Sequence, residues 1–269
     1  MASIVDLVLV AVMLSIVIPL GALLIVSFMP PGSREFPPTS YTLDNYAYVI
    51  NYLNFQQNMF NTFLFITIAV IISLAIAIPT AYGLARLRID YLIWAFTLAL
   101  VILVKSLPPG SLLVPMYEFL WRLGLTNTPL GVAISYQVYT LPYSIWLLMS
   151  FLLDLPRDIE LAARIDGAKS FARLRHVILP LSLPGIFSTV ILCYLNLWNE
   201  YMYSSVMVSS SRLQTAAVIL GQMVTSEYVV EWGVMAAANI LSVLPALLLV
   251  SVVQKNLSKV FVGGIKGGR

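Results

Sequence analysis

The residue types that most often carry out chemistry are scarce in this chain. Its 269 residues include one histidine, His176, and one cysteine, Cys193. These two form neither a metal-ligand spacing nor a nucleophile and base pair, and a lone cysteine in apolar sequence is typically a small packing residue. The sequence also lacks a GxxxxGK[ST] loop, whose backbone would hold the phosphates of ATP. We therefore expect no catalytic residue, no metal site and no hydrolysis of ATP by this chain alone.

One stretch, residues 154–185, holds the densest set of charges, and its sequence is DLPRDIELAARIDGAKSFARLRHVILPLSLPG. Pro156 suits a helix start, where its missing N–H has no helical partner to lose. Asp158 and Glu160 follow in the first turn, where acidic groups interact favourably with the helix dipole. Gly167 is expected to end or bend this short helix.

The stretch continues with a second helical run from about Ser170, which Pro180 and Pro184 are expected to stop. The whole segment therefore predicts a short helix–turn–helix. One side of its first helix is small and apolar, so it fits either the groove of a partner protein or the headgroup layer of a membrane. The residue types alone leave both settings open.

The elements around this stretch are apolar. The chain is 60% hydrophobic and 10% charged, with a mean hydropathy of +0.92, whereas roughly a quarter of a soluble sequence is charged. Apolar stretches of bilayer length, for which about 20 residues suffice, lie at residues 4–28, 59–85, 91–113, 130–153, 186–208 and 235–253. Because backbone groups cannot remain unpaired in lipid, each should be a helix. The prediction is an all-α integral membrane protein with six transmembrane helices, the first retained rather than cleaved as a signal peptide.

The distribution of basic residues predicts the orientation of these helices. With the N-terminus inside, the inner segments carry eleven Lys and Arg residues, namely Arg86, Arg88, Arg157, Arg164, Lys169, Arg173, Arg175, Lys255, Lys259, Lys266 and Arg269. The outer segments carry three, namely Arg34, Arg122 and Arg212. Because Lys and Arg accumulate in cytoplasmic loops, both termini are expected to be cytoplasmic. Residues 154–185 then lie on the cytoplasmic side between the fourth and fifth helices.

Residues 154–185 resemble the EAA loop of ABC-importer permeases, which has the form EAA, three residues, G, nine residues, I, one residue, LP. The matching positions are Ala162, Ala163, Gly167, Leu179 and Pro180, and Val177 replaces the Ile conservatively. The wider signature AARIDGA, residues 162–168, adds Asp166 and Ala168. By this resemblance, the loop forms a coupling helix that docks into a cleft of an ATP-binding subunit.

The first position of the motif departs from the family pattern, because it is Leu161 instead of Glu. In the family, that Glu is expected to pair with a basic group of the ATPase. Glu160 precedes this position by one residue and lies about 100° away around the helix, so it cannot simply take over the role. The contact is therefore expected to be apolar or to recruit Glu160 or Asp158.

The resemblance extends over nearly the whole chain. The segment PMYEFLWRLGLTN, residues 115–127, is similar to the carbohydrate-uptake branch, and WNEY at residues 198–201 agrees with it. It implies the smaller permease of a maltose- or trehalose-type importer, which forms half of a translocation pathway in the cell membrane. The implied partners are a second homologous permease, two ATP-binding subunits that carry ATP and Mg, an extracytoplasmic sugar-binding protein and the lipid bilayer, with no nucleic acid.

Residues that could contact a sugar combine hydrogen-bonding groups with aromatic rings. Lys105 lies about 15 residues from the inner end of its helix, roughly 22 Å along the axis, and ionisable residues in a span usually face a cavity or a partner. The candidates for the substrate pathway are Lys105, Ser106, Tyr136, Gln137, Asn196, Trp198, Asn199 and Glu200. The alternative for Lys105 is snorkelling or a contact with the partner permease, and for Glu200 it is a structural hydrogen bond.

This interpretation divides the chain into a first helix with its outer loop (1–58), a permease core (59–255) and a cytoplasmic tail (256–269). The outer loop 209–231 is a candidate contact with the binding protein. Two other functions stay open: an ABC permease for a non-sugar solute such as a peptide or phosphate, and an ion-coupled secondary carrier. The carrier would need inverted repeats and ionisable pairs at mid-membrane, and the sequence shows no convincing internal repeat.

Overall fold

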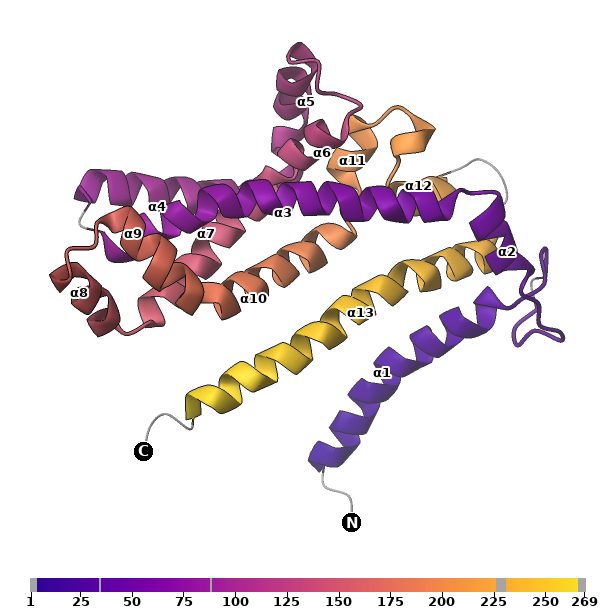
Figure 1. Ribbon diagram of the computed structural model, residues 1–269. Helices are drawn as coiled ribbons and strands as arrows, with labels where there is room; N and C mark the ends of the chain where they lie inside the picture. Colours follow the sequence, from indigo (N-terminus) through magenta and orange to yellow (C-terminus); the bar gives the residue numbers. More distant parts are fainter. Residues whose placement is uncertain (1–3, 34, 88, 226–230, 266–269) are drawn as a thin grey trace. The chain divides into compact units, whose positions relative to one another are not determined.

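The computed structural model describes residues 4–33, 35–87, 89–225 and 231–265, and every regular element within these ranges is helical (Figure 1). The all-α prediction is confirmed for this part of the chain. The helices form two compact units. One is built from the residues up to Phe60 together with Thr215–Pro245, and the other from Asn61–Gln214 together with the residues from Ala246 onward.

The first unit contains α1 (Ile4–Ser27), α2 (Asp44–Asn51), α12 (Ala216–Thr225) and the first part of α13 (Trp232–Ile265). Asn45 fixes the end of α1 against α2, because its buried side-chain amide donates to the carbonyls of Ser27 (3.0 Å) and Met29 (2.7 Å). The apolar core of the unit consists of Val49, Phe55, Ala216, Val234, Ala237 and Ala238. The outer loop predicted at 209–231 thus includes a helix, α12, and its residues 226–230 lie outside the described ranges.

The second unit is a bundle of long helices: α3 (Phe55–Arg86) from Asn61 onward, α4 (Tyr91–Ser106), α7 (Gln137–Asp154) and α10 (Leu179–Trp198). Small side chains let these helices approach closely. Ser73 donates to Ser144 at 3.0 Å, and Ser144 lies 3.3 Å from the buried thiol of Cys193. Cys193 is therefore a packing residue, as the sequence predicted.

Five of the short helices of the second unit are η1 (Pro109–Leu112), α5 (Leu113–Arg122), α6 (Pro129–Ser135), α11 (Met202–Met207) and η3 (Ser211–Leu213). Figure 1 shows α5, α6 and α11 gathered away from α8 and α9. Asn127 joins the loop between α5 and α6 to the loop after α11, because its side-chain oxygen accepts the backbone N–H groups of Ser209 (3.2 Å) and Ser210 (3.0 Å). The loops at this end of the bundle are thus fixed by side-chain to backbone bonds.

The number of membrane spans is only partly that predicted. Three helices of the described part are long and apolar enough to cross a bilayer: Val5–Ser27, Phe55–Arg86 and Ser170–Trp198. Two bent pairs, Tyr91–Ser106 with Gly110–Arg122 (102°) and Gln137–Asp154 with Arg157–Ile165 (79°), raise this number to five if each is one span. The helix at the predicted sixth span, α13, continues past residue 256, where a tail was expected, and residues 266–269 lie outside the described ranges.

The prediction that Pro180 and Pro184 stop the second helical run is wrong. The run continues from α9 (Ser170–Arg173) through a π-helical turn, η2 (Leu174–Ile178), directly into α10. In the π turn the Leu179 N–H bonds to the Leu174 carbonyl, so the turn holds one additional residue directly before Pro180, and the helix continues through the proline. The helix at the predicted fifth span therefore starts well before residue 186 and ends at Trp198.

Candidate functional site

The predicted short helix is present as α8 (Arg157–Ile165). It begins directly after Pro156, which precedes the first helical residue with an extended backbone (φ −59°, ψ 129°), and it is bent by 79° from α7. At its other end, Gly167 has a φ of +83°, and the Ala168 N–H bonds to the Ala163 carbonyl at 3.0 Å. This is the left-handed helix end that glycine favours, so the predicted role of Gly167 in ending the helix is confirmed.

The outward side of α8 is exposed and partly apolar. None of its nine residues, all of which the structure describes, is buried. Leu161 is 51% exposed and Ile165 is 86% exposed, and their spacing of four places them on one face of the helix. Phe171, at the start of the next helix, is also exposed. An apolar surface of this kind is typical of a site that binds another protein.

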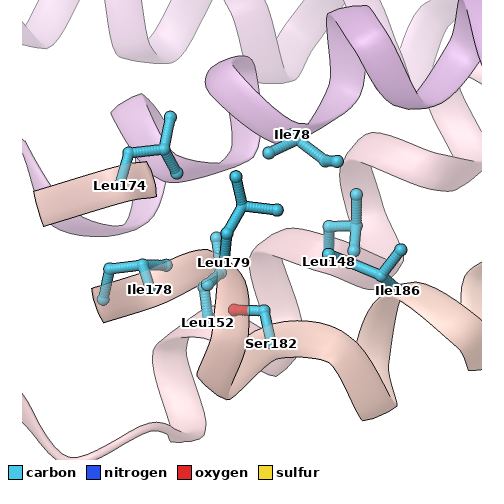
Figure 2. A pocket seen from close by; sticks show the side chains of 8 residues that line it. All are labelled: Ile78, Leu148, Leu152, Leu174, Ile178, Leu179, Ser182 and Ile186. Atoms are coloured by element: carbon cyan, nitrogen blue, oxygen red, sulfur yellow. The ribbon is translucent and has the colours of Figure 1, made fainter. Parts of the chain in front are cut away.

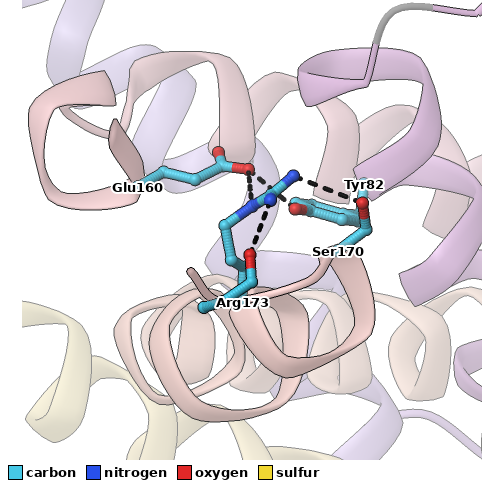
Figure 3. A network of polar contacts seen from close by, with 5 residues as sticks. Tyr82, Glu160, Ser170 and Arg173 are labelled. Atoms are coloured by element: carbon cyan, nitrogen blue, oxygen red, sulfur yellow. Dashed lines mark hydrogen bonds and ion pairs between the residues drawn. The ribbon is translucent and has the colours of Figure 1, made fainter. Parts of the chain in front are cut away.

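The inward side of α8 is held by polar contacts (Figure 3). The Glu160 carboxylate oxygen Oε1 accepts a hydrogen bond from the Tyr82 hydroxyl at 2.7 Å and one from Arg173 Nε at 3.3 Å. Arg173 also donates to the carbonyl of Ala168 at 2.9 Å and to Ser170 Oγ at 3.3 Å. The carboxylate that sequence reasoning considered for the partner contact therefore has partners within its own chain.

Arg86 makes a second connection at this end of the bundle. Its Nη2 donates to the carbonyls of Leu152 and of Leu155, the latter at 2.6 Å, so it joins the end of α3 to the end of α7. Around these contacts lies an open cleft of about 650 Å³. It is lined by Ala85, Arg86, Leu87, Ile89, Arg157, Glu160, Leu161, Arg164, Ser170 and Arg173.

Sequence reasoning did not identify Tyr82, Arg86 or Arg173 as site residues. Tyr82 and Arg86 lie four residues apart at the end of a long apolar helix, so they share one face. The signal that would have identified them is a tyrosine and an arginine four residues apart at the predicted cytoplasmic end of a span.

The second half of the predicted motif lies apart from α8. Leu179 and Ser182 line a small apolar cavity of about 10 Å³ between α3, α7 and α10, together with Ile78, Leu148, Leu152, Leu174, Ile178 and Ile186 (Figure 2). The cavity has room for about one water molecule, which would need two or more polar partners to be stable there. Leu179 is thus a packing residue at the start of α10, and Pro180 is exposed beside it.

Three of the substrate-pathway candidates make structural contacts. Glu200 is buried and accepts the backbone N–H groups of Tyr203 (2.8 Å) and Ser204 (3.1 Å), so it caps the start of α11. Tyr136 is buried, and its hydroxyl bonds to that of Ser204. Gln137 donates to the carbonyl of Ala69 at 3.0 Å.

Among the other candidates, Trp198 is buried and packs edge-on against Phe63. Four are exposed: Lys105, Ser106, Asn196 and Asn199. Lys105 Nζ lies 4.9 Å from the centre of the Tyr143 ring, a cation–π contact between α4 and α7. No group of three metal-ligating side chains occurs within the described ranges.

The described part of the chain thus combines several helices of bilayer length with a short, charged and exposed helix, α8. The family model for the inner membrane component of binding-protein-dependent transport systems matches residues 77–261, more than half of the chain. The chain therefore belongs to this family. It is a multi-pass permease of the inner membrane and the transmembrane subunit of an ABC importer, without catalytic activity of its own, and ATP binds to separate ATPase subunits.

Several relatives in the family are similar over most of their length. The sulfoquinovosyl glycerol transport system permease of Agrobacterium fabrum is 33% identical over 231 residues, which cover 86% of this chain and 80% of the relative. The trehalose/maltose transport system permease of Thermococcus litoralis is 30% identical over 253 residues, 91% of this chain and 90% of the relative. The trehalose transport system permease of Mycobacterium tuberculosis is 27% identical over 232 residues, 86% and 84% of the two chains.

Solved structures share the fold. A chain of a bacterial ABC transporter that imports the acidic polysaccharide alginate has a TM-score of 0.76 at 24% identity, covering 94% of this chain and 95% of that one. A chain of the inward-facing MetNI methionine ABC transporter has a TM-score of 0.62 at 19% identity, covering 77% and 95%. Because these two transporters carry unrelated solutes, the fold does not select a substrate.

Proposed function

We propose that this chain is the permease subunit of an ATP-driven sugar importer and forms half of its translocation pathway. The observation that carries the proposal is the similarity, over at least four fifths of both chains, to permeases named for saccharide transport. The complete importer would contain a second homologous permease, two ATP-binding subunits and an extracytoplasmic sugar-binding protein. The chain would cross the bilayer six times with both termini inside, with a core at residues 59–255.

The exposed polar candidates are the residues proposed to meet the sugar. Lys105, Ser106, Asn196 and Asn199 all present polar groups at the surface of this single chain, where a second permease would enclose them. The buried candidates have partners in the fold and would shape the pathway indirectly. A solute other than a sugar is the second candidate, because the methionine transporter has the same fold.

The substrate class is tested on the cognate binding protein, which carries the selectivity of such an importer. The protein is purified and titrated calorimetrically with mono- and disaccharides, and in parallel with amino acids, short peptides and phosphate. We expect heat of binding with a saccharide and none with the other three classes. Saturable binding of an amino acid, a peptide or phosphate, without any saccharide, would replace the sugar proposal by the second candidate.

The exposed face of α8 is proposed to dock an ATPase subunit, with Leu161 and Ile165 supplying an apolar contact where the family has a Glu. We expect Leu161→Asp or Ile165→Asp to reduce co-purification of the ATPase subunit. Burying a Leu or Ile side chain contributes about 1.5–3 kcal/mol, so each change should weaken the contact by roughly 10- to 100-fold.

Ile159 provides the matched control for this prediction. It is 44% exposed but lies on a different face of α8 from Leu161, because two residues turn the helix by about 200°. Ile159→Asp should therefore leave recovery of the ATPase subunit unchanged. Equal losses for Ile159→Asp and Leu161→Asp would show that the face of α8 assigned to docking is the wrong one.

A further inference from the structure

The position of α8 is not explained by apolar packing. All nine of its residues are described and none is buried. It is linked to α7 through Leu155 and Pro156, and to α9 through a short turn in which Gly167 has a φ of +83°. Short connections limit where the helix lies but leave its tilt free, so some other interaction must hold α8 in one orientation.

That interaction is the polar network of Tyr82, Glu160 and Arg173, which we call the polar clamp (Figure 3). Both charged partners are largely shielded from solvent, since the Arg173 and Glu160 side chains are 12% and 13% exposed. An exposed ion pair contributes little, whereas removal of one partner from a shielded, hydrogen-bonded pair leaves the other charge unsatisfied. Because its charged partners are shielded, loss of one side chain of the clamp should cost more free energy than loss of one partner of a surface ion pair.

The clamp joins three elements that are far apart in the sequence. Tyr82 lies in the last turns of α3, Glu160 on α8 and Arg173 at the end of α9. Because α9 continues through η2 into α10 without a break, Arg173 is part of a helix that extends to Trp198. Arg173 is also fixed from the other side by its bonds to Ala168 and Ser170. The clamp thus connects α8 directly to two bilayer-length helices.

We propose that the polar clamp makes α8 move as one body with the cytoplasmic ends of α3 and of the 170–198 helix. Glu160 is then a positioning residue of the coupling step rather than a contact with the ATPase. Docking therefore does not need a Glu at position 161, where this chain has Leu161. The proposal rests on the proposed docking of α8. It adds that a displacement of α8 by the ATPase reaches the pathway through the three side chains of the clamp.

The test measures whether α8 and α3 keep their distance when the ATPase changes state. Spin labels are attached to cysteines that replace Asp158 on α8 and Ile76 on α3, both of which are exposed, in a Cys193→Ala background. The complete importer in nanodiscs is measured by pulsed electron spin resonance without nucleotide and after trapping with ATP and vanadate. Recovery of the ATPase subunit and the rate of ATP hydrolysis are recorded on the same samples.

The parent protein should give one narrow distance distribution that is the same in both nucleotide states. Glu160→Ala should give a distribution that shifts when ATP and vanadate are added, because α8 then moves without α3. Tyr82→Phe should give a smaller shift, since the ion pair to Arg173 remains. Arg175→Ala, which removes an exposed basic residue two positions from Arg173, is the matched control and should behave like the parent.

Three results would overturn the clamp: a nucleotide-dependent shift in the parent, no shift in Glu160→Ala, or a broadening in Glu160→Ala that is equal in both states, which indicates a structural role alone. In each case the ATPase subunit is still recovered with the permease and ATP is still hydrolysed. Failure to recover the ATPase subunit even with the parent chain would count against the docking proposal instead. The two proposals therefore fail in different measurements.

Discussion

Gly167→Val is expected to abolish sugar uptake while the protein still inserts into the membrane and the ATPase subunits still hydrolyse ATP. The backbone at Gly167 has a φ of +83°, a conformation that costs an L-residue about 1–2 kcal/mol, and more when the side chain is β-branched. A β-carbon at this position meets no atom beyond the neighbouring residues within 4 Å, so the strain comes from the backbone conformation and not from a clash of the β-carbon. Relief of the strain would turn α8 relative to α9 and misplace both the docking face and the clamp.

The measurements for Gly167→Val are uptake of the saccharide that the binding-protein titration identifies, ATP hydrolysis, and the amount of permease in the membrane fraction. Gly124→Val is the matched control, because Gly124 has a φ of +68° and equally free surroundings but lies beyond α5, away from α8. It introduces the same type of strain elsewhere, so uptake should be retained. Normal uptake by Gly167→Val would remove the support for α8 as the coupling helix.

Gly185→Ala should be strongly destabilising although it adds one methyl group. A β-carbon on Gly185 would lie 2.5 Å from Cγ of Phe151, which belongs to α7, whereas α10 carries the glycine. Ring atoms so near the backbone cannot move aside without shifting a helix. Overpacking of this kind costs about 1–3 kcal/mol, and small residues are what allow membrane helices to approach closely.

The Gly185 prediction is measured as the midpoint of thermal unfolding of the detergent-solubilised importer. Gly83→Ala is the matched control, because a β-carbon there meets no atom within 4 Å and alanine favours the helix by up to about 1 kcal/mol. Adding Phe151→Ala to Gly185→Ala should recover part of the loss, which appears as a favourable coupling energy in a double-mutant cycle. Purely additive effects of the two changes would contradict the contact between α7 and α10.

Features that depend on neighbouring residues were predictable from the sequence. The apolar runs placed α1 and α3 within a few residues of their observed bounds, and the AARIDGA stretch with Gly167 predicted α8 and its end. Features that depend on distant residues were not. Tyr82 and Glu160 are 78 residues apart, so only the folded bundle brings the hydroxyl to the carboxylate.

The failures have identifiable physical causes. The sequence predicts that Pro180 stops the helix, but the π turn before it accommodates the proline. No residue type in 174–178 predicts such a turn. For Glu200 the sequence left a sugar contact and a structural hydrogen bond open, and its carboxylate accepts the N–H groups of Tyr203 and Ser204 in the first turn of α11. In both places the structure depends on hydrogen bonds of backbone groups, which side-chain patterns in the sequence indicate only weakly.

The π turn at 174–178 also sets the phase between the two parts of the 170–198 helix. A turn closed by the bond from the Leu179 N–H to the Leu174 carbonyl holds one residue more than an α-helical turn. Deleting any one residue of η2 would restore an ordinary α-helix and rotate Arg173 by about 100° relative to α10, away from Glu160. Because of this one additional residue, α10 packs against α7 while Arg173 faces α8. The length of the 174–178 segment therefore matters more here than its composition.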